Sequence, residues 1–118
     1  MGAFYKLRVW RKAHALALLT YKITAAYPKT ETYGLTSQMR RSAVSVMTNI
    51  AEGCGRNRDR ELSRFLGIAL GSLTELESLT LLSKSLGVCN KEATGELLEL
   101  IRPLSKMLAR LRTSLAEG

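Results

Sequence analysis

Apolar residues along this 118-residue chain recur every three or four positions, which is the spacing of one face of an α-helix. No long segment alternates apolar and polar residues, so strands are not expected. The pattern predicts helices over about residues 6–26, 35–54 and 57–86, and from Asn90 to near the C-terminus. Four helices joined by short loops favour an all-α fold, an up-down-up-down antiparallel four-helix bundle forming a single domain over residues 1–118.

The first predicted helix has apolar residues on two faces. One face holds Leu7, Trp10, His14, Ala17 and Tyr21, and the other holds Val9, Leu16, Leu19 and Ile23. A surface helix of a monomer needs one apolar stripe. We therefore expect one face in the core and the face of Val9, Leu16 and Ile23 against a second subunit.

The second predicted helix carries an apolar stripe and a polar stripe side by side. The apolar one is Leu35, Met39, Ala43, Val46, Ile50 and Cys54, and the polar one is Gln38, Arg41, Ser45, Asn49 and Glu52. The polar stripe mixes donors and acceptors, so we expect it to be structural, with Asn49 and Glu52 buried in the bundle or a subunit contact. Thr36 is the expected N-cap.

The third and fourth helices have one clear core stripe each. The stripe of the third helix is Leu62, Phe65/Leu66, Ala69, Leu73, Leu76 and Thr80. The stripe of the fourth helix is Leu97, Ile101, Leu104, Leu108, Leu111 and Leu115. Gly67, Gly71, Thr74 and Ser78 form a row opposite the third core stripe, and small side chains let another backbone approach. We expect that row at a subunit interface. Asn57 and Asn90 are the expected caps, and Pro103 predicts a kink near residues 99–103.

Charge changes this picture, because the basic excess lies in one half of the chain. The net charge is +8, from 18 Lys and Arg against 10 Asp and Glu, and residues 1–64 hold the whole excess. A positive field attracts polyanions, although a basic surface also simply favours solubility, and both interpretations stay open. The candidate phosphate contacts are Lys6, Arg8, Arg11, Lys12, Arg40, Arg41, Arg56, Arg58, Arg60 and Arg64. In an antiparallel bundle the start of helix one and the turn after helix two lie at the same end, so these clusters are expected to merge there.

Catalytic and metal-binding patterns are missing from the sequence. It has no glycine-rich phosphate loop, no GxSxG and no HExxH. Cys54, Cys89 and His14 lack metal-ligand spacing, and the two cysteines are expected to be buried free thiols. We expect no cofactor, no metal and no enzymatic activity. The longest apolar run is too short to cross a membrane, and the chain is expected to be cytoplasmic.

Four ordered segments resemble the bacterial family of 23S ribosomal RNA intervening-sequence proteins. They are FYKLRVWRKAHAL at 4–16, YGLTSQMRRSAVSV at 33–46, NIAEGCGR at 49–56 and FLGIALGSLTELE at 65–77. The resemblance implies a ring-like homo-oligomer of four-helix bundles, a pentamer, and extends to the nucleic-acid-binding accessory proteins of diversity-generating retroelements. In that family, basic residues are frequent at the positions of Gly67 and Leu70, and proline at that of Met47.

Three functions fit the sequence. The first is an oligomer that binds RNA or DNA phosphates through its basic residues with little reading of base sequence. The second is a structural adaptor whose ring binds an acidic protein, such as a reverse transcriptase-like partner. The third, an enzyme that uses the polar stripe from Gln38 to Glu52, has the least support. No membrane partner is expected.

Overall fold

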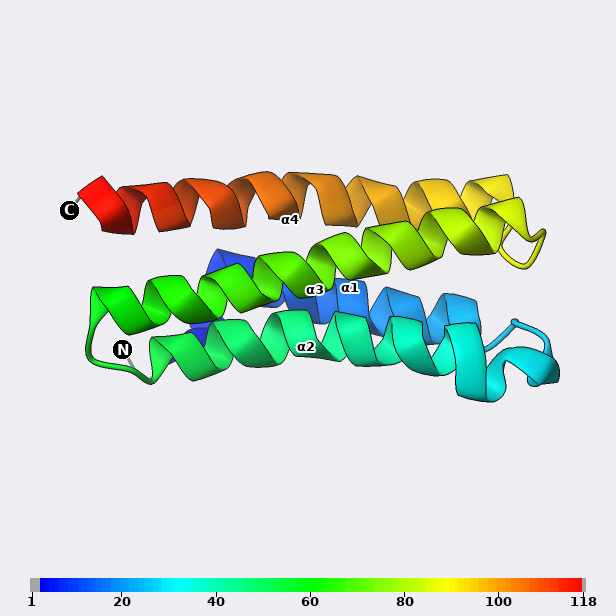
Figure 1. Cartoon of the computed structure of the whole chain (residues 1–118), viewed down its shortest axis with the longest axis horizontal. Coiled ribbons are helices and arrows are strands. Elements are labelled where there is room, and N and C mark those ends of the chain that lie inside the picture. The colour runs from blue at the N-terminus through cyan, green and yellow to red at the C-terminus, as the bar shows by residue number, and fades with distance from the viewer. Residues whose placement is uncertain (1–2, 118) are drawn as a thin grey trace.

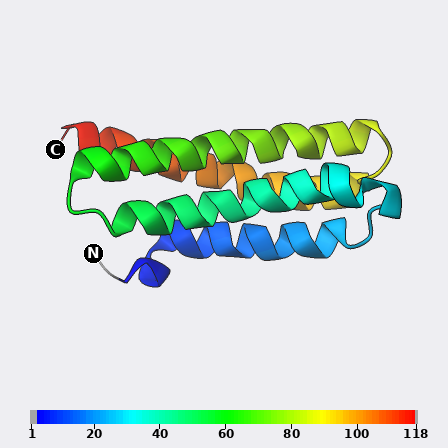
Figure 2. The ribbon, with the colours of Figure 1, turned by 60° about the horizontal axis from the view of Figure 1, so that its bottom comes forward.

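Four long helices make up most of the computed structural model, which describes residues 3–117. They are α1 (Arg8–Thr24), α2 (Ser37–Cys54), α3 (Asp59–Ser85) and α4 (Lys91–Glu117). Each helix packs against the next one along the chain, and α1 also packs against α4, so the four close into a bundle of 45 × 20 × 20 Å (Figures 1 and 2). The described residues contain no strand, and the predicted four-helix architecture is confirmed.

The two ends of the bundle are closed by different segments. The short helix η1 (Phe4–Lys6), the start of α1, the α2–α3 turn and the end of α4 share one end, which we call the basic end (Figure 1). The opposite end, called the far end, holds the α3–α4 turn and the α1–α2 connection. That connection contains the short helical turns η2 (Lys29–Glu31) and η3 (Thr32–Thr36).

Most of the core comes from the stripes predicted on α2, α3 and α4, and α1 completes it. Along η3 and α2, every member of the stripe from Leu35 to Cys54 is buried, and on α3 only Leu62 at the edge is half-buried. On α4, the leucine and isoleucine positions are fully buried as far as Leu108, after which Leu111 and Leu115 are half-buried. By length and hydropathy α3 would also suffice to cross a bilayer, a property that core helices of bundles share.

The packing of α1 within the bundle contradicts the subunit contact predicted for Val9 and Leu16. Val9 and Leu16 are only 9 % and 0 % exposed and lie in the core of their own chain, and Ile23 is half-buried against it. Placing Val9 and Leu16 at a subunit interface was therefore wrong. The reason is that α1 packs against both α2 and α4, so a single chain covers both of its apolar faces. Tyr21, expected in the core, is exposed.

The helix ends differ from prediction at two of three caps. Thr36 has helical backbone angles and makes no capping bond, because the wide turn η3 continues the helical path upstream; there the Glu31 carboxylate accepts from Leu35 N–H at 3.2 Å. Arg58, not Asn57, precedes α3, again without a side-chain cap. Asn90 is confirmed as a cap, since its Oδ1 accepts from Ala93 N–H at 2.8 Å.

Pro103 does not break α4, which continues to Glu117. Its ring removes one backbone hydrogen bond, the one to the carbonyl of Glu99. Both residues are exposed, so water can reach the carbonyl that is left without a donor. The helix therefore tolerates the proline on its solvent side.

The far end buries a cluster of hydroxyl groups and sulfur atoms. Met39 Sδ accepts from Tyr27 Oη at 3.4 Å and from Ser83 Oγ at 3.5 Å, and Cys89 Sγ accepts from Thr94 Oγ1 at 3.4 Å. Removal from water raises the pKa of Tyr27 to about 12. Across residues 3–117, no fully buried side-chain nitrogen or oxygen lacks a hydrogen-bond partner, so this cluster is internally satisfied.

Candidate nucleic-acid interface

The α2–α3 turn and the last turns of α4 place four arginines around one shallow hollow at the basic end. Arg58, Arg60, Arg64 and Arg112 line it together with Glu61 and Ser63. Arg112 was missed by sequence reasoning, because it belongs to the electrically neutral half of the chain. Only the return of α4 along the full length of the bundle brings it to this end.

Two neighbouring arginines are partly occupied by contacts within the chain. The guanidinium groups of Arg56 and Arg64 lie over the Phe65 ring, 5.2 and 4.6 Å from its centroid. Arg56 also pairs with Glu52 at 3.5 Å, and Arg64 pairs with Glu61 at 3.1 Å. Such exposed pairs contribute little to stability, but they reduce the local positive field.

The remaining arginines of the hollow are better placed to meet an anion. Within residues 3–117, no ion pair involves Arg58, Arg60 or Arg112, and all three are exposed. A guanidinium presents planar donors that match phosphate geometry. The hollow therefore presents three guanidinium groups that are outside any ion pair among the described residues, beside the carboxylate of Glu61, which pairs with Arg64.

The guanidinium of Arg112 lies over Gly67 of α3. A Cβ atom at Gly67 would come 3.0 Å from Arg112 Cζ, so the missing side chain makes room for this arginine. Gly67 is thus half-buried beneath an arginine of its own chain, and its predicted place in a subunit interface stays a prediction. The rest of the small-residue row, Gly71, Thr74 and Ser78, is exposed.

The predicted basic residues separate into two groups. One group comprises Lys6 of η1 with Arg8, Arg11 and Lys12 of α1. The η1 turn and the start of α1 lie at the same end as the α2–α3 turn, as predicted (Figure 1). Arg40 and Arg41 do not join them, because they lie near the start of α2, toward the far end. The expectation that every cluster merges is wrong for this pair.

Part of the polar stripe joins α2 to α3. The hydroxyls of Ser45 and Ser72 are hydrogen-bonded at 2.8 Å, and Asn49 Nδ2 donates to the carbonyl and hydroxyl oxygens of Ser45 at 2.8 and 3.0 Å. Ser45 and Asn49 are half-buried, whereas Gln38, Arg41 and Glu52 are exposed. Within the single chain Glu52 is not buried in the bundle, since its carboxylate instead meets Arg56 in solvent; its burial in a subunit contact stays a prediction.

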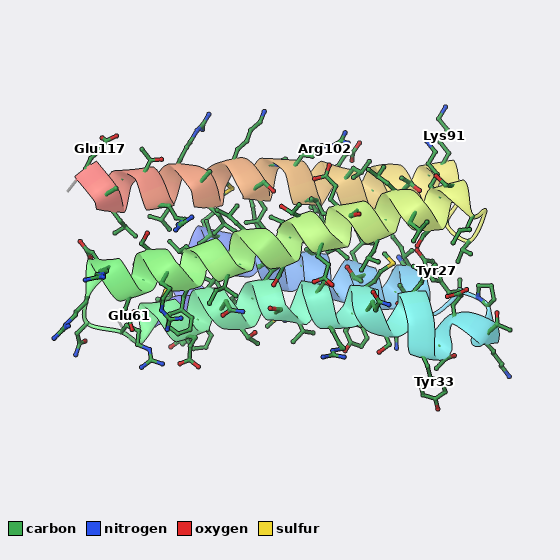
Figure 3. The ribbon with its side chains drawn as sticks, in the orientation of Figure 1. Tyr27, Tyr33, Glu61, Lys91, Arg102 and Glu117 are labelled. Atoms are coloured by element: carbon green, nitrogen blue, oxygen red, sulfur yellow. The ribbon has the colours of Figure 1, made fainter. Side chains whose placement is uncertain are left out.

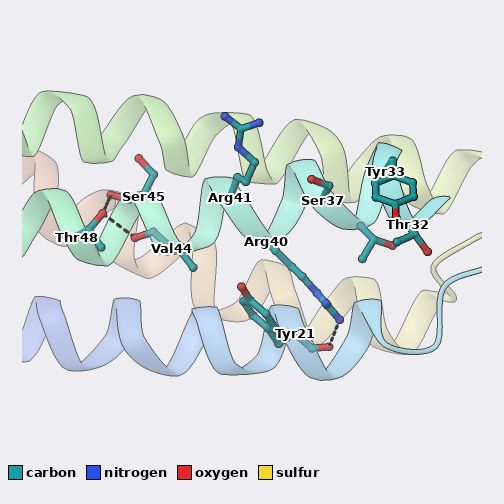
Figure 4. Close-up of a pocket in the computed structure, with 10 residues that line it drawn as sticks. Tyr21, Thr32, Tyr33, Ser37, Arg40, Arg41, Val44, Ser45 and Thr48 are labelled. Atoms are coloured by element: carbon teal, nitrogen blue, oxygen red, sulfur yellow. Dashed lines mark hydrogen bonds between the residues drawn. The ribbon is translucent and has the colours of Figure 1, made fainter. Parts of the chain in front are cut away.

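Two grooves flank the start of α2. One lies against α1 and is lined by Tyr21, Arg40 and Thr48, and the other lies against α3 and is lined by Gln38, Ser72 and Glu75. Tyr33, Ser37, Arg41 and Ser45 line both grooves (Figure 4). Tyr33 is 96 % exposed, and Figure 3 shows its ring projecting away from the bundle. The sequence signal for it was an aromatic residue in a loop, next to Gly34.

The other reactive side chains lie outside these grooves. His14 is half-buried and stacks on the Trp10 ring, with centroids 4.9 Å apart. Cys54 and Cys89 are buried free thiols, as predicted, and burial raises the pKa of the Cys54 thiol. No group of three His, Cys, Asp or Glu residues suited to a metal ion occurs in the described part of the chain.

Comparison with known proteins adds one result to this geometry. The family model described as 23S rRNA-intervening sequence protein matches residues 5–110, a span that includes α1, α2 and α3 completely and most of α4. No curated protein matches the chain.

Proposed function

Because this chain belongs to the family of 23S rRNA-intervening sequence proteins, we propose that it is a non-enzymatic, homo-oligomeric bundle that binds RNA or DNA phosphates at its basic end. The family description itself states no biochemical activity. The observation that carries the proposal is the hollow at the basic end, where Arg58, Arg60 and Arg112 gather without ion pairs among residues 3–117. Phosphate oxygens are among the acceptors that such guanidinium groups bind in a bidentate way.

The proposed contact is to the nucleic-acid backbone. Arginine and lysine bound to phosphates fix a strand in place but carry no sequence information. Each phosphate that is neutralised releases counterions, so the logarithm of affinity should fall with the logarithm of salt concentration by about 0.7–0.9 per phosphate. The protein is therefore expected to bind many sequences with similar affinity and to release them at high salt.

The test is a filter-binding titration against one RNA and one DNA at several salt concentrations. The variant replaces Arg58, Arg60 and Arg112 together by Ala, which leaves the two arginines on Phe65 in place. The matched control replaces Lys29, Lys84 and Lys91 by Ala, which removes the same charge from exposed positions at the far end. We expect the arginine variant to bind all sequences more weakly with a smaller salt slope, and the lysine variant to stay close to wild type.

Two results would contradict the proposal. Equal binding by both variants would mean that net charge, rather than this hollow, attracts the ligand. Binding without salt dependence, or no binding at all, would leave the basic end as a surface that favours solubility. In that case, binding to an acidic protein partner becomes the better-supported function.

The proposed assembly uses the outer face of α3. Gly71, Thr74 and Ser78 lie exposed on this face, and the exposed apolar side chains of Ile68, Leu81 and Leu82 lie on the same helix. A small-residue row with apolar flanks lets a second helix approach closely. The resemblance stated above gives five subunits as the expected number.

Light scattering at micromolar protein concentration tests the assembly. Wild type should show a multiple of the 13.1 kDa chain mass. Gly71→Arg should lower the measured mass, because a long charged side chain would stand on the proposed contact. A wild-type monomer would contradict the assembly and leave the phosphate contact to be judged on its own.

A further inference from the structure

We propose that the groove between α1 and α2 binds a nucleotide, with its phosphate between Arg40 and Arg41 and its base against the ring of Tyr33. The proposal deepens the proposed function, because it assigns a base-contacting site to the same class of ligand, near the start of α2 and apart from the basic end. We favour a nucleotide within a single strand over a free nucleotide as the occupant of this groove, because the ligand proposed above for this chain is a polynucleotide.

The phosphate half of the site has fixed positive charge. Arg40 Nε donates to Thr24 Oγ1 at 2.9 Å, and a terminal nitrogen of Arg40 donates to the Tyr21 carbonyl oxygen at 3.3 Å. The same guanidinium lies 4.5 Å from the centroid of the Tyr21 ring. These contacts orient Arg40 across the groove (Figure 4) and use only part of its five donors.

Arg41 supplies the second positive charge. It is exposed, and no ion pair among residues 3–117 involves it. No carboxylate lines this groove, whereas Glu75 lines the groove on the α3 side of the helix. The α1 side therefore holds Arg40 without a carboxylate, and Arg41 stands on the ridge between the two grooves, with its side chain projecting toward α3 (Figure 4). A phosphate on the α1 side is reached by Arg41 from this ridge and is kept apart from Glu75. Hydroxyl groups of Thr32 and Ser37 border the same space as further donors.

The base half of the site is Tyr33. A tyrosine that is 96 % exposed offers both faces of its ring, and base–aromatic stacking is the usual way in which proteins hold unpaired bases. The backbone beneath the ring is defined, because Gly34 departs from helical angles (φ −110°, ψ −111°) and Glu31 accepts from Leu35 N–H. The ring thus stands at the mouth of the groove that holds both arginines.

A duplex would fit this arrangement poorly, because its bases are already stacked on one another. The site is therefore expected to separate single strands from duplexes, which the phosphate contacts of the basic end do not do. This difference allows the inference to be tested apart from the proposed function.

The experiment measures fluorescence anisotropy of a labelled ten-nucleotide adenylate RNA and of a labelled ten-base-pair DNA duplex. Tyr33→Ala should weaken binding of the RNA by about 5- to 150-fold, the range of one lost stack, and leave duplex binding within about two-fold. Tyr33→Phe keeps the ring and should bind like wild type. Arg41→Ala should weaken RNA binding, whereas Lys84→Ala, an equal charge change at the far end, should not.

A calorimetric titration with adenosine monophosphate separates the two sources of the ligand chemistry. Weak binding that Tyr33→Ala abolishes supports the site, even if the basic end binds nothing and the proposed function fails. Unchanged RNA affinity in Tyr33→Ala overturns the inference while leaving the proposed function intact. A lower mass of Tyr33→Ala in light scattering also overturns it, because the ring would then pack against a neighbouring subunit.

Discussion

The far end of the bundle buries a cluster of polar side chains, whereas the arginines that line the hollow of the basic end lie in solvent. At the far end, Tyr27, Ser83 and Thr94 are buried and donate to sulfur atoms within the chain. At the basic end, Arg58 and Arg60 are exposed and outside any ion pair among residues 3–117. The contrast separates side chains that hold the fold from side chains available to a ligand, and substitutions at the two ends should differ accordingly.

The largest expected effect is at the far end. Tyr27→Ala removes a buried ring and leaves a cavity beside Met39, which should lower the free energy of unfolding by about 3–5 kcal/mol. Tyr33→Ala is the matched control, because its ring is 96 % exposed, and it should change stability by less than about 0.5 kcal/mol. Urea unfolding followed by circular dichroism measures both. Equal losses of unfolding free energy in the two variants would mean that Tyr33, like Tyr27, is packed into the fold.

Alkaline pH should also weaken the far end. The pKa of Tyr27 is raised to about 12, above the ordinary value near 10, so between these values the unfolded chain releases a proton that the folded chain keeps. The stabilisation is therefore complete below pH 10 and is lost as the pH rises toward 12, by roughly 2 kcal/mol. Tyr27→Phe should flatten this loss in urea unfolding at pH 8, 10 and 11.5, and Tyr33→Phe should not.

A close helix contact stabilises the basic end from within. A Cβ atom at Gly53 would lie 2.9 Å from Phe65 Cβ and 3.0 Å from Leu62 Cδ1. Gly53→Ala should force α2 and α3 apart at a cost of about 1–3 kcal/mol, more than the gain of up to about 1 kcal/mol for replacing glycine in a helix. At Gly95 of α4 a Cβ atom would have nothing within 4 Å, so Gly95→Ala should show that gain alone. A higher melting temperature for Gly53→Ala would refute the close contact.

The smallest expected effect concerns the arginines of the basic end. Replacing Arg58 and Arg60 by Gln should change the free energy of unfolding by no more than about 0.5 kcal/mol, because neither side chain is buried or part of an ion pair among the described residues. Thermal melting in low salt measures this change. A loss above 1.5 kcal/mol would mean that these arginines hold the fold, which would weaken their assignment to a ligand.

Most of the core could be predicted because burial repeats with the helix period. The stripe along η3 and α2 from Leu35 to Cys54 needs only local spacing, and every member is buried. Helix α1 was harder, since periodicity shows that two faces are apolar but not which molecule covers them. Val9 and Leu16 proved to be covered by the same chain, a fact that depends on α4 packing against α1.

The surface features depend on contacts between distant parts of the chain. Arg112 reaches the hollow of the basic end across 48 residues of sequence from Arg64, and the absence of a side chain at Gly67 makes room for it. The groove beside Tyr33 needs α1 and α2 together. No local pattern contains such a pairing, so the sequence predicted the basic residues but not how they are grouped.

The first turn of α1 has a consequence for local opening of the bundle. This helix begins after Leu7 without a side-chain cap or an acidic residue in its first turn, and Arg8 and Arg11 lie where the helix dipole is positive. At the other end, α4 begins with the Asn90 cap and Glu92 in its first turn. Amide hydrogens at the start of α1 should therefore exchange with solvent sooner than those at the start of α4. A polyanion bound at the basic end would offset this repulsion, so its binding should slow exchange in the first turn of α1.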